Sequence, residues 1–381
     1  MKRNIYFAYA AKLLGAFSYG VFFLLPLYIN ALGGNEALSG KLLLVSGIGT
    51  IACIFITKKI MNLYNIGIQF LGTIGALLCA VGALCMSLNM HLNNMLFLYM
   101  ALVGAGWGIS FNIAYCLASV LGNHNKTRFF SYMSAFSVLG MGIAPPCIKS
   151  LGLKGDFHTS FLIASISALL AAISFAFIKT ETLKCVDSET NEKHQGALWE
   201  ILKTKARFSL VMLLLGTCAF TVMMNFQSTY AKKLGLDYSV FYLLFTTSVV
   251  GSRLVITDYI AKYNHLKSIV FIELTMLIGV MLFAFVIDFK ILYPIAAVLF
   301  GIGYGLSFPI IQTILVNFTK KQFHKDALSY FSLSYFIANY GFPYFAGKII
   351  VNAGYQTMVL VLIGILAFDF LLSIVQYSRD N

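Results

Sequence analysis

Five ionisable side chains stand inside long apolar stretches of this 381-residue chain, and their types make them the first candidates for chemistry. A charged group is costly in apolar surroundings, so it commonly marks a binding site or a proton relay. A lysine there could bind an anionic or carboxylate-bearing ligand, and burial could let a carboxyl group exchange a proton near neutral pH. The five residues are Lys12, Arg253, Asp258, Glu273 and Asp369.

Lys12 shares one face of its segment with polar and aromatic residues if that segment is helical. We expect this face to line a water-filled cavity, with Lys12, Tyr19 and Asn30 as substrate-binding residues. In the alternative, the lysine stem reaches toward lipid headgroups and the charge binds no substrate. The residues on the face are Lys12, Gly15, Tyr19, Phe23, Pro26 and Asn30.

Composition decides which elements must hold these side chains. The chain is 59% hydrophobic and 11% charged, whereas a soluble domain is about 45–50% apolar and about 25% charged. So few charges cannot cover a water-soluble protein of this size. This excludes a soluble enzyme, a nucleic-acid-binding module and a disordered chain. We expect an integral, multi-pass membrane protein surrounded by the lipid bilayer.

The apolar segments predict an all-α membrane protein with twelve transmembrane helices. A helix needs about 20 mostly apolar residues to cross a bilayer, and six such segments precede a polar stretch and six follow it. The predicted parts are an N-terminal six-helix bundle (1–179), a central cytoplasmic loop (180–207) and a C-terminal six-helix bundle (208–381). The expected spans are roughly 5–31, 41–58, 66–89, 94–121, 128–151, 158–179, 208–227, 239–261, 267–288, 291–318, 327–350 and 356–377.

Positively charged residues gather on one side of these expected spans. The chain has 27 Lys and Arg and a net charge of +13. With the N-terminus inside, 18 of the 27 fall in cytoplasmic segments. This asymmetry predicts that both termini are cytoplasmic, and we expect the membrane to be a bacterial inner membrane. It also accounts for most of the positive charge without a nucleic-acid partner.

The second half of the polar stretch, 197–206, has a helical pattern. Leu198, Ile201 and Leu202 fall on one face, and Trp199 is beside them. Two interpretations remain open. The segment is either a short helix lying in the membrane interface or a solvated linker with a frayed helix.

The two halves of the chain repeat each other. The segment 104-GAGWGISFN-112 matches 301-GIGYGLSFP-309 at five of nine positions, with an offset of 197. Ser131-Tyr132 with Pro145 matches Ser329-Tyr330 with Pro343 at an offset of 198. The glycines lie within apolar helices and have no following Lys-Ser/Thr, so we interpret them as sites of close helix packing and not as a phosphate loop.

With twelve expected spans, a central loop and repeated halves, the chain resembles the major facilitator superfamily of secondary transporters. The resemblance implies two pseudo-symmetric bundles around a cavity lined by the first, fourth, seventh and tenth spans, with help from their neighbours. The substrate-binding residues that it suggests, besides those of the first span, are Asn112, Tyr115, Thr221, Asn225, Tyr304, Gln312 and Asn339.

The superfamily's motif GxxxDRxGRR, found after the second span, has a counterpart at 58-KKIMNLYNIG-67, where Asn62 replaces the acid. The second-half copy begins at Arg253. The resemblance implies that residues of these two loops close the cytoplasmic side by contacts that form in one state and break in the other. The candidate gating residues are Asn62, Gly67, Arg253, Asp258 and Lys262.

The predicted function is secondary active transport of a small organic solute by alternating access. Glu273 and Asp369 are the candidates for proton coupling, with an Arg253–Glu273 ion pair as the alternative role of Glu273. With Lys12 in the cavity, we expect a proton-coupled exporter of an amphipathic or carboxylate-bearing solute such as a siderophore or metallophore. Multidrug efflux, uptake of an organic acid or sugar, and a non-transporting scaffold or sensor of the same fold remain alternatives.

The histidines argue against an enzyme. All six fall in loops or at span ends, and no two have the spacing of metal ligands on a helix. We therefore expect neither enzymatic activity nor a metal or other cofactor, and we expect the protein to act as a monomer.

Overall fold

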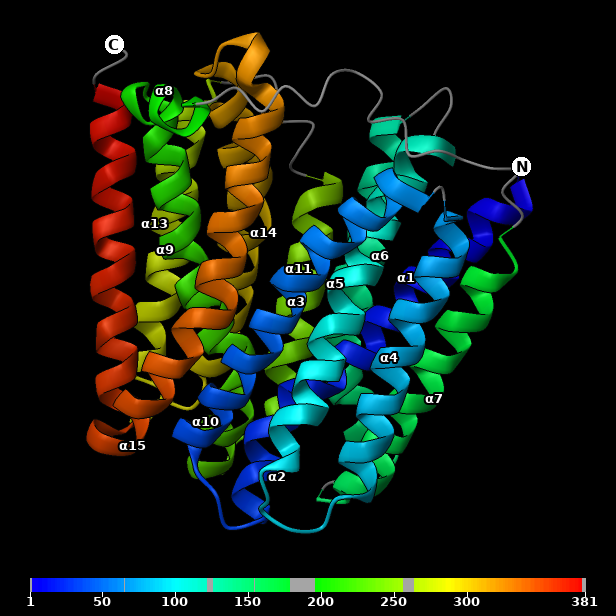
Figure 1. The fold of residues 1–381 in the computed structure, drawn as a ribbon. Coiled ribbons are helices and arrows are strands. Elements are labelled where there is room, and N and C mark those ends of the chain that lie inside the picture. Colours follow the sequence, from blue (N-terminus) through cyan, green and yellow to red (C-terminus); the bar gives the residue numbers. More distant parts are fainter. Residues whose placement is uncertain are drawn as a thin grey trace. The chain divides into compact units, whose positions relative to one another are not determined.

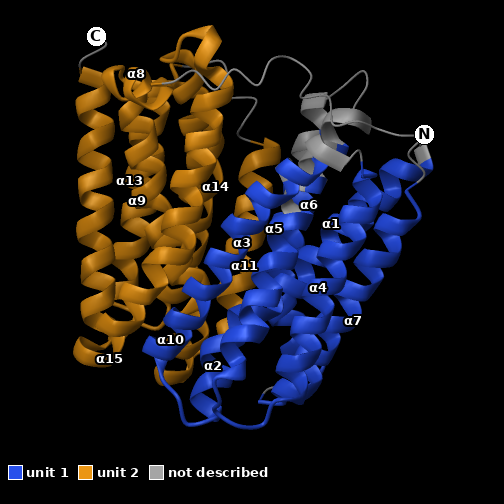
Figure 2. Ribbon diagram, in the orientation of Figure 1, with its two compact units in different colours: residues 1–191 blue, residues 192–381 orange. Residues whose placement is uncertain are grey.

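The computed structural model describes residues 2–64, 66–121, 126–153, 155–178, 196–255 and 264–378. Within these ranges it does not describe the side chains of 2, 58, 62–64, 111–112, 114–116, 118–121, 126–128 and 130–131. Every regular element in the described ranges is a helix (Figure 1), so the all-α prediction is confirmed. The chain divides into two compact units, residues 1–191 and 192–381 (Figure 2), and the division falls inside the predicted loop 180–207.

The first unit contains the helices of the first half of the repeat. Pro26 enters α2 at its first turn, where it cannot donate a backbone hydrogen bond, and a 3₁₀ turn therefore precedes it. One predicted span is thus built from three helical pieces. The elements of the unit are α1 (Lys2–Val21), η1 (Phe22–Leu24), α2 (Leu25–Ala31), α3 (Glu36–Tyr64), α4 (Ile68–Leu88), α5 (Met95–Leu121), α6 (Lys126–Ser150) and α7 (Phe157–Ala176).

The second unit repeats this order. Its last element continues through two predicted spans and reverses at Gly354, whose φ of 86° is a left-handed value that favours glycine. Figure 1 shows the two arms of α15 in orange and red. The elements are α8 (Ala197–Lys203), α9 (Ala206–Asn225), α10 (Gln227–Lys233), α11 (Tyr238–Val255), α13 (His265–Ala284), α14 (Leu292–Asn317), η2 (Lys321–Phe323) and α15 (His324–Ser378).

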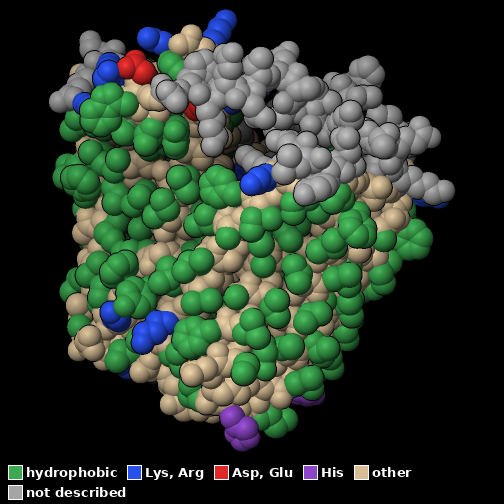
Figure 3. Space-filling view, in the orientation of Figure 1, with side chains coloured by type: hydrophobic (Ala, Val, Ile, Leu, Met, Phe, Trp, Pro, Cys, Tyr) green, Lys and Arg blue, Asp and Glu red, His purple; other side chains and the backbone are tan. Residues whose placement is uncertain are grey.

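Nine helical stretches of the described residues are long and apolar enough to cross a membrane. The α15 stretch counts once among them although it contains two helices, and α5 and α6 are a further 27 and 25 residues long. The predicted count of twelve spans stays a prediction. Large apolar side chains such as Phe271, Phe345 and Phe368 are exposed on the units. Figure 3 shows hydrophobic side chains over the middle of the visible face, which is typical of a surface in contact with lipid.

The helices of the two units pair in the same way. In the first unit α5 packs on α3 and α4, and α4 packs on α7; in the second, α14 packs on α11 and α13, and α13 packs on α15. The α1 helix packs on α6 and α7, as α9 packs on α15. The internal repeat of the sequence is therefore a repeat of helix packing.

Three glycines of the first repeat make this packing possible, as the sequence predicts. A Cβ on Gly104 or Gly108 would meet the backbone of Ser46 or Thr50 on α3, and a Cβ on Gly106 would meet that of Gly75 on α4. The first and third glycines thus face α3, and the middle glycine faces α4.

The glycines of the second repeat alternate in the same way. Gly301 and Gly305 face Phe245 and Val249 of α11, and Gly303 faces the backbone of Met276 on α13. Close helix approach at small residues is common in membrane proteins.

The α8 helix covers the predicted helical segment 197–206 except its last residues. Ala197 and Ile201 are buried against the second unit, whereas Leu198 and Trp199 are exposed. Glu200 and Lys203 form an ion pair of 2.8 Å. The predicted apolar face is therefore divided, because Ile201 packs on the protein and Leu198 points away from it.

Asp156 caps the start of α7, and this gives a prediction about pH. Its side chain accepts a hydrogen bond from the Thr159 backbone N–H at 3.1 Å, and the hydrogen bonding by Thr159 lowers the pKa of Asp156 below its ordinary value. A lowered pKa means that the carboxylate stabilises the fold above its ordinary pKa and ceases to do so as the pH falls through the lowered value. We expect Asp156→Ala to lower the Tm slightly at neutral pH, measured by circular dichroism. The difference should vanish in acid, and a constant difference would contradict the cap.

Candidate functional site

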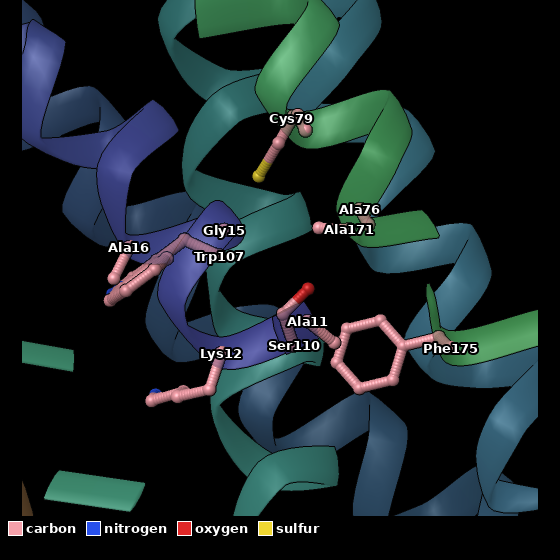
Figure 4. Close-up of a pocket in the computed structure, with 11 residues that line it drawn as sticks. Ala11, Lys12, Gly15, Ala16, Ala76, Cys79, Trp107, Ser110, Ala171 and Phe175 are labelled. Atoms are coloured by element: carbon pink, nitrogen blue, oxygen red, sulfur yellow. The ribbon is translucent and has the colours of Figure 1, made fainter. Parts of the chain in front are cut away.

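Lys12 lies within the first unit and stacks against an aromatic pair. It is 8% exposed, and its Nζ lies 5.2 Å from the centre of the Trp107 ring on α5. Tyr19, two turns further along α1, stacks on the same ring system at 4.5 Å and 19°. Figure 4 shows the Lys12 and Trp107 side chains extending to the same side of α1. A cation over an aromatic face is stabilised by the ring quadrupole, so Trp107 helps to hold the ammonium group inside the apolar unit.

A small cavity adjoins Lys12 between α1, α4, α5 and α7. Its volume is about 20 Å³, enough for about one water molecule. Ala76, Ala171 and Ser110 line it, and the buried Ser110 hydroxyl has no hydrogen-bond partner. The surroundings of this cavity are mostly apolar, with the Ser110 hydroxyl as a polar group beside Lys12, and the cavity is too small to hold an organic solute.

The second unit has an equivalent aromatic stack. Tyr304, the repeat partner of Trp107, stacks on Phe220 of α9 with ring centres 4.1 Å apart and an interplanar angle of 4°. Phe220 was not among the predicted site residues, because its own side chain is apolar and the prediction selected polar residues of this span. The repeat could have found it, since α9 corresponds to α1 and Phe220 to Tyr19 at an offset close to 200.

Three predicted residues of the second unit come together. Thr221 of α9 donates a hydrogen bond of 2.7 Å to the Asn339 backbone carbonyl on α15. The Asn225 amide donates to the Thr221 carbonyl at 2.8 Å and to its hydroxyl at 3.1 Å. Thr221 and Asn225 are buried, and Asn339 is half-buried. The Thr221 side chain thus joins α9 to α15, and the Asn225 side chain bonds to Thr221 within α9.

Other predicted substrate-binding residues lie apart from these groups. Gln312 is half-buried on α14. The Asn30 amide donates to Glu36 at 2.8 Å and joins α2 to α3, about 27 Å along the helical path from Lys12. Asn112 and Tyr115 belong to α5, but their side chains lie outside the described residues.

The predicted gating residues are described only in part. Gly67 directly precedes α4, and its carbonyl accepts from the backbone N–H of Phe70 at 3.0 Å. Arg253 donates through Nε to the Gly305 carbonyl at 2.9 Å. The Asn62 side chain, Asp258 and Lys262 lie outside the described residues.

Glu273 forms no ion pair with Arg253, so that alternative is wrong. Glu273 Oε1 accepts a hydrogen bond of 2.8 Å from Ser307 of α14, and its Oε2 has no donor. Arg253 approaches α14 from α11, whereas Glu273 approaches it from α13. The prediction relied on the similar depth of the two residues in their spans, and α14 lies between them.

Glu273 instead lies beside Asp369 of α15. Glu273 is 1% exposed and Asp369 is fully buried. The two carboxyl groups are close enough to hydrogen-bond to each other when one of them carries a proton. As two carboxylates they would offer each other no donor, and both Asp369 oxygens would lack one. Two predicted proton carriers on helices far apart in the sequence thus form one pair.

Buried charge-bearing side chains within packed apolar helices, in two units of the same topology, are typical of a membrane transporter. The sequence pattern of the Major Facilitator Superfamily matches residues 112–340, more than half of the chain. The chain belongs to this superfamily, and it is a secondary transporter with a small-molecule substrate. No curated protein matches it by sequence.

Solved transporters have a similar fold. A mutant of the nucleoside transporter NupG has a TM-score of 0.84 at 12% identity, covering 98% of this chain and 100% of that chain. A mutant of the peptide transporter POT has a TM-score of 0.76 at 15% identity, with coverage of 98% and 93%. A POT family transporter in complex with 5-aminolevulinic acid has a TM-score of 0.75 at 17% identity, with coverage of 97% and 95%.

Proposed function

We propose that this transporter exports a carboxylate-bearing organic solute in exchange for protons. The observation that carries the proposal is Lys12, a cation buried in a membrane helix and held over Trp107. Such a cation is costly in the bilayer and commonly belongs to a substrate pathway. A carboxylate attracts it, and the neighbouring Tyr19 and Trp107 rings offer apolar surface to the rest of the solute.

The pair Glu273–Asp369 supports proton coupling. Two adjacent carboxyl groups cannot both ionise cheaply in a low-dielectric interior, so a proton is the natural ligand of the pair. No charged residue of α1 is acidic, and the described part of α5 carries no charged side chain. The proton carriers therefore belong to the second unit under this proposal.

The contact between α1 and α6 supports export as the proposed direction of transport. The segment 140-GMGIAPP-146 resembles the glycine-proline motif common in exporters of the superfamily. A Cβ on Gly140 would crowd the Leu13 carbonyl, and one on Gly20 would crowd the backbone of Met141. This tight contact supports export. The distribution of Lys and Arg supports a cytoplasmic location of both termini.

Counterflow in proteoliposomes tests the proposal. Vesicles loaded with one unlabelled solute are diluted into the labelled form, and its transient accumulation is measured. The panel comprises citrate, a carboxylate siderophore, 5-aminolevulinic acid, a dipeptide and a nucleoside. The last three follow from the names of the structural neighbours. We expect counterflow with a carboxylate-bearing solute. Counterflow of the nucleoside alone would contradict the substrate class, and none with any solute would favour a scaffold or sensor.

A further inference from the structure

The Glu273–Asp369 pair occupies a position that the first unit fills with alanines. At the repeat offsets Glu273 corresponds to Ala76, Asp369 to Ala171 and Ser307 to Ser110. A Cβ on Gly15 would lie 3.9 Å from Ala171 Cβ, and one on Gly216 would lie 3.7 Å from Asp369 Oδ2. These two contacts are equivalent, so the correspondence holds in space as well as in sequence.

This equivalence shows that the fold does not require the carboxyl groups. The same helices pack in the first unit with Ala76 and Ala171, where they leave the small cavity beside Lys12. The second unit instead bears the cost of two buried acids, which in a membrane helix is large. A purely structural role does not explain that cost.

Unpartnered polar side chains extend from the pair toward one end of the unit. Gln376 lies seven residues beyond Asp369 on the same face of α15, about 10 Å along the helix. It is fully buried, and neither polar atom of its side chain has a hydrogen-bond partner. On α9, which runs antiparallel to this arm, Ser209 lies seven residues before Gly216. Its buried hydroxyl also has no partner. Ser209 and Gln376 therefore lie at the same depth along the helices, two turns from the Glu273–Asp369 pair.

On α13 and α15, the other direction from the pair is apolar. The α13 and α15 residues that follow it toward the opposite end are buried hydrophobic side chains, among them Met276, Val280, Leu362 and Leu366. Buried unsatisfied polar groups are rare in proteins and call for a water or an ion. Gln376 and Ser209 lie on the side where α8 covers α9 and the end of α15. Among the described residues of the unit, the hydroxyls of Thr217, next to Gly216 on α9, and of Thr246 on α11 are also buried without a hydrogen-bond partner.

Few other titratable groups face the pair. Cys218 of α9 interacts electrostatically with Asp369, and α14 contributes Ser307. The described titratable residues at the end of the unit that carries α8 include Glu200 and Lys203 of α8, Lys205 and Arg207 at the start of α9, His265 and Lys267 at the start of α13, Lys320, Lys321, His324, Lys325 and Asp326 from η2 to the start of α15, and Tyr377 at the end of α15.

We infer that Glu273 and Asp369 hold one shared proton inside the second unit, which exchanges through Gln376 and Ser209 with the end that carries α8. One group is the carboxylic acid and donates to the other, a carboxylate, while the Ser307 hydroxyl donates to Glu273. The pair then carries a single negative charge. Its role in coupling rests on the proposed function, whereas its proton occupancy does not.

Infrared spectroscopy of the protein in lipid tests the occupancy. We expect the absorption of a protonated carboxyl group to persist at neutral pH in the wild type. It should be absent from the double variant E273Q/D369N, or from E273A/D369A, which copies the alanines of the first unit. An unchanged band in a folded double variant, or no band in the wild type, would overturn the inference, whatever the outcome for transport.

Variants at and beside Gln376 test the proposed route of proton exchange. Gln376→Leu should slow transport driven by a pH gradient severalfold, while counterflow at equal pH stays at the wild-type rate. Val375→Leu places the same side chain on the exposed face of the same turn and should change neither rate. Equal rates for Q376L and V375L under a pH gradient would overturn the proposed exchange route through Gln376 and Ser209. If the wild type itself ignores the gradient, the proposed coupling fails, and the infrared result still decides the shared proton.

Discussion

Lys12→Gln is expected to abolish concentrative transport while the protein still folds and reaches the membrane. Losing a charge partner that is buried and hydrogen-bonded costs about 3 kcal/mol, or roughly a hundredfold in affinity. Glutamine retains a polar end and a similar length but cannot attract a carboxylate. Because Trp107 and Tyr19 stack on each other without the lysine, the aromatic surface should persist. The measurement is the concentration dependence of counterflow, which should show a higher KM for the carboxylate solute.

Lys348→Gln is the matched control. Lys348 also lies over an aromatic ring, with its Nζ 4.2 Å from the centre of Tyr344, but it is exposed. Its replacement should leave the KM unchanged. Wild-type counterflow by the Lys12 variant would remove Lys12 from the substrate site.

Gly303→Ala is expected to destabilise the second unit by about 1–3 kcal/mol, the usual cost of overpacking. The added Cβ would lie 2.6–2.7 Å from Met276 atoms, including the backbone N and Cα of α13. Backbone atoms of a packed helix cannot avoid the added methyl group by a rotamer change, as a side chain can. Either α13 and α14 must separate, or the variant must unfold more readily.

Gly364→Ala provides the comparison for this substitution. Gly364 also lies in a membrane helix, but nothing lies within 4 Å of its hypothetical Cβ. Alanine there should be neutral or stabilise the helix by about 0.5–1 kcal/mol. Thermal unfolding of the two variants in the same detergent measures the difference. Equal Tm values for them would contradict the close contact at Gly303.

The sequence predicts the helices and their packing well because both depend on local patterns that repeat in the two halves. The glycines at 104–108 and 301–305 mark the close contacts of α5 and α14, and each one faces the helix that the repeat requires. Hydropathy alone finds both arms of α15. The reversal at Gly354 is also visible in the sequence as a gap between the last two apolar segments.

The sequence predicts the candidate site less well because contacts depend on which face a residue occupies. Depth along a span suggested Arg253 as the partner of Glu273, yet α14 separates them and Asp369 is the neighbour. The structure buries Lys12, and its ring partner Trp107 could not be derived from the spacing within α1. A comparison of equivalent positions in the halves would have been more informative. It pairs Ser110 with Ser307 and reveals acids where the first unit has alanines.

Two copies of one helix arrangement thus carry different chemistry. The first unit holds the cation Lys12 beside Trp107, and the second holds the acids Glu273 and Asp369 beside Ser307. Under the proposed function the first group binds the solute and the second binds the proton. Because the two sites lie in different units, a substitution in the solute site leaves the side chains of the proton site unchanged, and the reverse also holds.

Transport driven by a pH gradient tests this account most directly. Proteoliposomes containing the wild type are given equal concentrations of the labelled carboxylate solute on both sides, and a pH gradient is then imposed. The account predicts that the solute moves against the proton flow and accumulates above equilibrium, and that a protonophore abolishes this accumulation. Equilibration at the same rate and to the same level with and without the gradient would contradict proton-coupled transport.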